Sequence, residues 1–143
     1  MSDFRDLVGS ELGPTSWLDV TQERIDSFAA ATDDRQWIHV DPERAAAGLF
    51  GTTIAHGFLT LSLCVPMLSE VLPPSDGMVV NYGVNRVRFP APVPSRGRIR
   101  GRFRVVSIDE TSRGDRAVIE ATVECEGISK PVCVASLVVV VVG

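Results

Sequence analysis

Two histidines and an acidic pair lie close together in the first half of the chain. His39 comes shortly after Asp33 and Asp34, and His56 stands between Ala55 and Gly57, in the stretch where a long apolar helix is predicted to begin. A carboxylate and an imidazole can exchange protons with a bound water molecule. The start of a helix offers backbone N–H groups to a developing negative charge. Together these residue types predict acid/base chemistry on a carbonyl substrate.

Composition limits the classes of protein to consider. The 143 residues are 45% hydrophobic and 22% charged, which is typical of a globular chain, and their length suits one domain spanning residues 1–143. A net charge of −4 argues against nucleic acid as a partner. We expect no membrane partner and a cytoplasmic setting, because the chain opens without a signal-like segment and the apolar run 132–142 is too short for a spanning helix. The three cysteines lack metal-site spacing and are interpreted as buried free thiols.

Periodicity predicts three helices in the first half. Thr21 is a favourable N-cap for a helix that ends near Thr32. Residues 33–40 fit neither the helical nor the strand period and are predicted to form an ordered loop. Asp41 caps a short helix, with Pro at its first turn. Residues 55–71 are apolar on nearly every face, so this helix is expected to be surrounded on most sides.

The second half follows the two-residue period of strands. Four extended runs are predicted, at about 78–89, 98–109, 116–126 and 131–142. Antiparallel pairing of the second and third runs, through a connection at 109–115, would place an arginine face beside a glutamate face. The last run is apolar on both faces, which indicates a central position in the sheet or a subunit contact. The pattern as a whole predicts an α+β fold with an antiparallel sheet curled around the apolar helix.

Seven arginines lie between Arg86 and Arg104. Such a concentration of positive charge is compatible with phosphate binding. Alternate spacing, however, places at least four of the arginines on one solvated strand face, opposite acidic partners. The second interpretation is preferred.

The run ATDDRQWIHVDPERAAAGLFGTTIAHGFLTLSL resembles the hydratase motif of the MaoC-like family. Two further segments, NYGVNRVRFPAPV from residue 81 and KPVCVA from residue 130, are similar to its nodulation-protein-N-like branch. The resemblance extends over nearly the whole chain. It implies a hot-dog fold, in which the antiparallel sheet wraps around the long central apolar helix, and it implies a homodimer.

The same resemblance implies an activity. The expected reaction is hydration of a trans-2-enoyl-CoA to the (R)-3-hydroxyacyl-CoA and its reverse, as in fatty acid metabolism, without a metal or redox cofactor. CoA, or the pantetheine of an acyl carrier protein, arrives as part of the thioester substrate. The motif places the catalytic carboxylate on Asp34, the catalytic imidazole on His39 and the oxyanion-binding amide on Gly57. Substrate-binding roles are expected for Gly57, His56, Ser62 and Asn81.

Departures from the motif leave alternatives open. Asp33 stands where the family usually has glycine; if that position needs a positive φ, Asp tolerates it better than most residues. Individually, Asp34 is compatible with a turn-forming role and His39 with a buried structural histidine. Two other functions also fit the resemblance: a thioesterase on the same fold, or a non-catalytic thioester-binding subunit of a hydratase complex.

Overall fold

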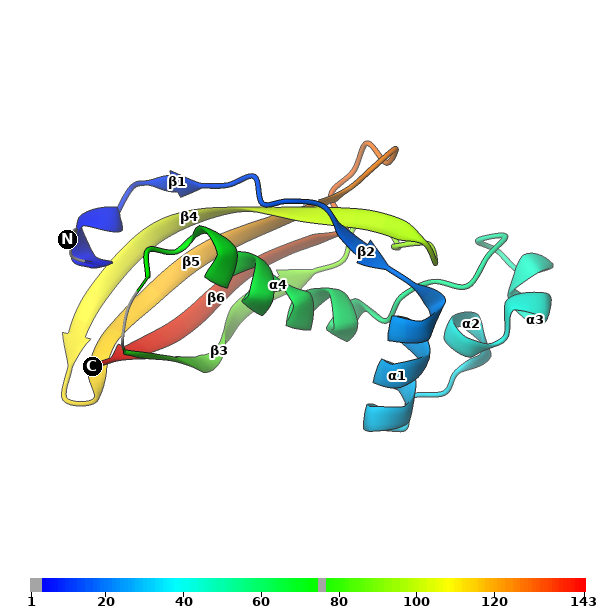
Figure 1. Ribbon diagram of the computed structural model, residues 1–143, viewed down its shortest axis with the longest axis horizontal. Coiled ribbons are helices and arrows are strands. Elements are labelled where there is room, and N and C mark those ends of the chain that lie inside the picture. The colour runs from blue at the N-terminus through cyan, green and yellow to red at the C-terminus, as the bar shows by residue number, and fades with distance from the viewer. Residues whose placement is uncertain (1–3, 75–76) are drawn as a thin grey trace.

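The computed structural model describes residues 4–74 and 77–143 (Figure 1). Its helices are η1 (Phe4–Leu7), α1 (Gln22–Thr32), α2 (Trp37–Val40), α3 (Pro42–Ala46) and α4 (Gly57–Val71). Its strands are β1 (Glu11–Leu12), β2 (Leu18–Val20), β3 (Met78–Arg88), β4 (Gly97–Thr111), β5 (Gly114–Cys125) and β6 (Cys133–Val142). In Figure 1, α4 runs along the inner side of the curved sheet, and α1, α2 and α3 gather beyond one end of it. Within the described ranges, no helix has the length and apolar content needed to cross a membrane.

The sheet confirms the predicted α+β class. Its strands are antiparallel in the order β1-β4-β5-β6-β3, and β2 also pairs with β4. β6 lies between β5 and β3, which is the first of the two placements predicted for a run that is apolar on both faces, a central position in the sheet. The arginine and glutamate faces also meet as predicted: Arg100 lies opposite Glu124, and Arg98 bonds to Glu126 at 2.9 Å.

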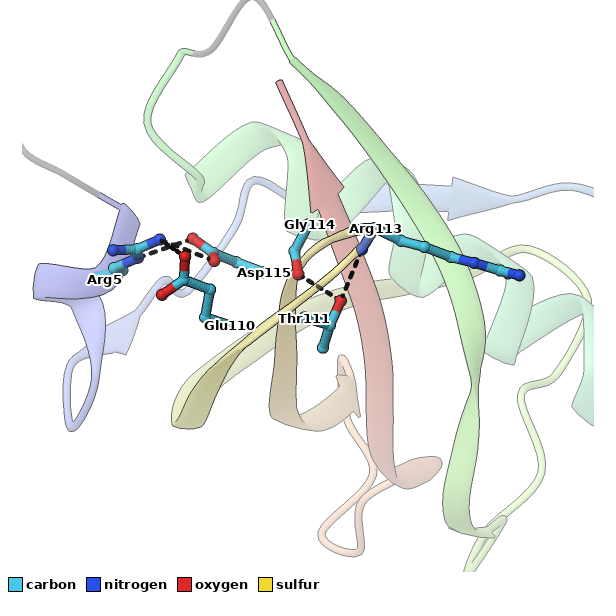
Figure 2. Close-up of polar contacts among 6 residues, drawn as sticks. All are labelled: Arg5, Glu110, Thr111, Arg113, Gly114 and Asp115. Carbon is cyan, nitrogen blue, oxygen red and sulfur yellow. Dashed lines mark hydrogen bonds and ion pairs between the residues drawn. The ribbon is translucent and has the colours of Figure 1, made fainter.

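The connection between β4 and β5 is much shorter than the predicted segment 109–115. The two strands remain paired as far as Thr111 and Gly114, so polar residues that were assigned to a loop belong to the ladder. Gly114 has a φ of 142°, and a Cβ there would overlap the carbonyl oxygen of Val141. The tight turn therefore depends on glycine at this position. Arg5 of η1 holds the end of the hairpin by two hydrogen bonds to Asp115, at 3.0 and 3.1 Å (Figure 2).

The hydrophobic core forms between α4 and the sheet. From the helix it takes Leu59, Leu63, Cys64, Met67 and Leu68, and from the strands it includes Ile99, Phe103, Ile119 and Val123. This confirms the predicted wrapping of the sheet around the helix. The helix begins at Gly57, two residues later than predicted. It is also not covered on all sides within one chain, because Phe58 and Val65 remain 66% and 42% exposed.

The predicted loop at 33–40 contains one helical turn, α2. This turn is held by packing that a four-residue pattern cannot reveal. The Arg44 guanidinium lies 4.3 Å from the ring centre of Trp37, and a Cβ at Gly48 would lie 3.2 Å from that indole. Glycine at position 48 therefore lets α3 end close against the Trp37 ring. The prediction of a loop without helical structure was wrong.

Candidate active site

Asp34 lies on the segment that leaves α1. The chain turns there because Asp33, the C-cap of α1, adopts a left-handed conformation with φ of 61°. The position that the MaoC-like motif usually fills with glycine therefore does take a positive φ, which Asp tolerates better than most residues. Arg35 bonds to the Asp33 carboxylate at 2.5 Å. The Asp34 side chain is exposed and makes no hydrogen bond with any described residue, whereas its backbone bonds to Thr32 and His56.

His39 lies in α2 and is buried, with 6% of its surface exposed. Its Nδ1 lies 2.7 Å from the carbonyl oxygen of Ile54, and the Ile54 amide donates to the Ile38 carbonyl at 3.0 Å. Because a carbonyl oxygen only accepts, Nδ1 carries the proton in the neutral ring. Nε2 then keeps its lone pair. This nitrogen has the form that a general base requires.

Gln22, at the start of α1, binds the backbone of His39. Its amide nitrogen donates to the His39 carbonyl at 2.7 Å, and its amide oxygen accepts from the buried Thr53 hydroxyl. The side chain thus joins α2 to the segment that precedes α4. Sequence analysis did not find Gln22 or Thr53. No local pattern distinguishes them, since their bonds join residues 17 and 31 positions apart.

His56 immediately precedes α4 and is 2% exposed. Its Nε2 lies 2.9 Å from the carbonyl oxygen of Asp34. Its ring stacks on that of His39, with centroids 3.8 Å apart and planes inclined by 20°, and the Phe28 ring lies 4.9 Å away. The turn after α1, the short helix α2 and the start of α4 are therefore brought together at this one ring.

Asp34, His39 and His56 converge. One carboxylate oxygen and one nitrogen from each imidazole all lie within 4.8 Å of one another. Burial lowers the pKa of His39 below its ordinary value of 6.5, and the neighbouring His56 lowers it further; the bond to Ile54 and the charge of Asp34 act in the opposite direction. A neutral imidazole beside an accessible carboxylate can share a water molecule and exchange its protons.

The same three side chains also have the donor types of a metal site. Each imidazole, however, already uses one nitrogen for a backbone carbonyl. The remaining lone pairs lie in the planes of two stacked rings. An ion held in the plane of one ring would lie well out of the plane of the other, so the observed arrangement does not fit two imidazole ligands on one ion.

Gly57 begins α4, and the first amides of a helix have no intrahelical acceptor. It lines a cavity of about 250 Å³ together with Ile54, Thr60 and Phe89, among others. A Cβ at Gly57 would lie 2.8 Å from the Phe89 ring. Glycine therefore allows the aromatic ring to lie directly against the start of the helix, beside the amides that could bind an oxyanion.

Ser62 and Asn81 lie elsewhere. Both line a second, largely apolar cavity of about 290 Å³ formed by α4, β3 and β6. The Ser62 hydroxyl donates to the Phe58 carbonyl at 2.8 Å, within its own helix. The structure thus brings together four of the six predicted site residues, Asp34, His39, His56 and Gly57, and places the other two on a separate cavity.

Residues 3–127 match the family model of the MaoC like domain. The chain belongs to the MaoC-like family. Its relatives include 3-hydroxyacyl-thioester dehydratase Z of Mycobacterium tuberculosis H37Rv, with 48% identity over 97% of this chain and 93% of the relative. Nodulation protein N of Rhizobium leguminosarum bv. viciae is 44% identical over 99% of this chain and 90% of the relative.

Solved structures confirm the fold of this MaoC-like chain. The R-hydratase PhaJ1 from Pseudomonas aeruginosa, in its unliganded form, superposes with a TM-score of 0.76. The match covers 94% of this chain and 81% of that one at 23% identity, so it establishes the hot-dog fold alone. The fold expected from the sequence motif is therefore confirmed.

Proposed function

We propose that this protein is an (R)-specific enoyl-thioester hydratase, which in reverse is a 3-hydroxyacyl-thioester dehydratase. One observation carries the proposal: the Asp34 carboxylate and a His39 ring nitrogen lie within 4.8 Å of each other, and the His39 ring stacks on His56, the residue that precedes α4. The similarity to 3-hydroxyacyl-thioester dehydratase Z of M. tuberculosis supports the same hydro-lyase class.

In the proposed mechanism, Asp34 and His39 hold one water molecule beside the β-carbon of the substrate. An O–H bond of the water breaks as its oxygen bonds to the β-carbon, and the released proton passes to the Asp34–His39 pair. The pair gives one proton to the α-carbon, so it ends the cycle in its starting protonation state. Negative charge that develops on the thioester oxygen is stabilised by the amide of Gly57, at the positive end of the α4 dipole.

The proposed substrate is an acyl thioester of CoA or of an acyl carrier protein. Water addition leaves the overall oxidation state of the substrate unchanged, so the reaction requires no redox cofactor. The two catalytic side chains supply the proton transfers, so the mechanism assigns no step to a metal ion. The cytoplasmic setting stays an expectation from the sequence.

The test follows the loss of ultraviolet absorbance of a trans-2-enoyl-CoA. Asp34→Asn and His39→Gln are each expected to lower kcat by on the order of 10²–10⁴-fold, because each removes one proton-transfer group. Asp33→Asn is the matched control, since it changes the adjacent exposed carboxylate and keeps a residue that tolerates a positive φ. Wild-type rates in both site variants would refute the assignment. Release of free thiol in place of a hydroxyacyl thioester would instead identify a thioesterase.

We further propose that residues 1–143 form one domain that acts as a homodimer through β3. This strand ends the sheet order, so only one of its edges is paired among the described strands. Along it, Met78, Val79, Val80, Tyr82 and Val84 are 43–64% exposed. An unpaired apolar edge strand favours association with another chain. Sedimentation of the purified protein at the mass of a monomer would contradict this part of the proposal.

A further inference from the structure

His56 takes no step in the mechanism above, yet it is among the most buried polar residues described, at 2% exposure. Its position as the N-cap of α4 does not explain why the side chain is buried, because the side chain makes no capping hydrogen bond. A buried polar ring normally has a specific hydrogen-bonding role, since burial without a partner is costly. The contacts of the ring indicate what that role is.

The polar contact of His56 is with the residue proposed to carry the catalytic carboxylate. Nε2 lies 2.9 Å from the Asp34 carbonyl oxygen and must be the donor, because that oxygen can only accept. In the neutral ring the lone pair is then on Nδ1, which is buried and makes no hydrogen bond with any described residue. The hydrogen bond to Asp34 is thus the polar interaction through which the side chain acts.

Two aromatic contacts also fix the ring. It stacks on His39 at 3.8 Å and lies 4.9 Å from Phe28 at an angle of 57°. Phe28 belongs to α1, the helix whose end leads into Asp34. A side chain held in this way from α1 and α2 provides a rigid donor. The Asp34 carboxylate, by contrast, is exposed and rests on a segment that leaves α1 through a left-handed turn.

We propose that His56 is a positioning residue: its Nε2–H ties the backbone of Asp34 to the start of α4 and so fixes the distance between the carboxylate and His39. The inference rests on the proposed hydratase function. Reacting groups are sensitive to such placement, since a displacement of about 1 Å can cost on the order of 10²-fold in rate. The substrate itself does not need to touch His56 for this role.

Two substitutions separate the hydrogen bond from the packing. His56→Phe keeps an aromatic ring against His39 and Phe28 but removes the donor. His56→Gln removes the ring and keeps an amide N–H at about the reach of Nε2. We expect His56→Phe to lower kcat by on the order of 10–100-fold with KM changed less than about threefold, and His56→Gln to regain most of the loss. Thermal melts establish that both variants are folded.

The inference is overturned if His56→Phe has the wild-type kcat, or if His56→Gln is as slow as His56→Phe. These results differ from failure of the proposed function, in which the wild type itself does not hydrate enoyl thioesters. A second measurement tests the hydrogen bond whether or not the protein hydrates enoyl thioesters. The chain has two histidines, so ¹⁵N spectra of the imidazoles at about pH 8, assigned with His39→Gln, report each tautomer directly. A proton on Nδ1 of His56 would exclude the hydrogen bond.

Discussion

The sheet and the segment that carries the site are held together in different ways. β4 and β5 pair continuously from Ile99 opposite Cys125 to Thr111 opposite Gly114, with one irregularity near Val105. The site segment, residues 21–57, is joined by single bonds between distant residues: Gln22 to the His39 carbonyl, His39 to the Ile54 carbonyl, and His56 to the Asp34 carbonyl.

This difference predicts where substitutions act. In a ladder, each backbone bond has neighbours that keep the strands in place when one contact weakens. In the site segment, each side-chain bond is a separate connection, so we expect its loss to displace one of the proposed catalytic groups directly. We therefore expect substitutions in the sheet core to reduce stability and leave the chemistry unchanged, whereas substitutions in the site segment reduce activity more than stability.

The largest expected effect on stability is that of Phe103→Ala. Phe103 is 2% exposed in the core and lines neither described cavity. Removing a buried aromatic side chain typically lowers the free energy of unfolding by about 3–5 kcal/mol. Denaturant titration measures this loss, and kcat of the folded protein should stay at the wild-type value. Phe103→Leu, which leaves a smaller void, is the control. A large fall in kcat without a loss of stability would contradict the separation of the two regions.

Gln22→Ala is expected to have an intermediate effect on stability and a larger one on activity. It removes the partner of the buried Thr53 hydroxyl and of the His39 carbonyl. Such unsatisfied groups cost about 1–3 kcal/mol. Loosening of α2 should also lower kcat.

Gln22→Glu is the second variant, since it retains the acceptor for Thr53 and loses the donors to His39 and Asp26. Its carboxylate would repel that of Asp26, so it should recover little of the stability or the activity. If both Gln22 variants kept wild-type kcat, α2 would be held by packing alone.

The smallest expected effect is the contribution of His39 to the pH dependence of stability. Because the pKa of His39 is lowered in the folded protein, the unfolded chain binds the proton first as the pH falls below about 6.5. The free energy of unfolding therefore decreases from about pH 6.5 down to the lowered pKa, and this contribution is constant below it. The wild type should lose stability over that range relative to His39→Gln, as urea titrations at several pH values would show. Parallel curves for the two proteins would refute it.

Much of this architecture follows from local patterns. The alternation of Arg100 and its neighbours with apolar residues predicts β4 and its pairing with the acidic face of β5, because strand geometry has a fixed two-residue period. Thr21 marks the start of α1 through its side chain, which accepts from the Arg24 amide at 3.1 Å. The hydratase motif predicts Asp34 and His39 together.

Other features have no local signature. The partners of His39 and His56 lie 15 and 22 residues away, so these contacts exist only after α1, α2 and α4 have come together. The same is true of α2, whose single turn depends on Trp37 packing near α3. Ser62 and Asn81 were assigned by their place in matching segments. That criterion cannot distinguish two cavities that are lined by different residues of one helix.

The contact between Gly57 and Phe89 has a consequence for inhibitors. The aromatic ring is 38% exposed and lies against the start of α4 in the space that any side chain at position 57 would occupy. A compound that approaches the Gly57 amide must therefore be thin at its leading end, or must turn Phe89 aside. We therefore expect flat carbonyl groups to fit beside the Phe89 ring better than branched headgroups.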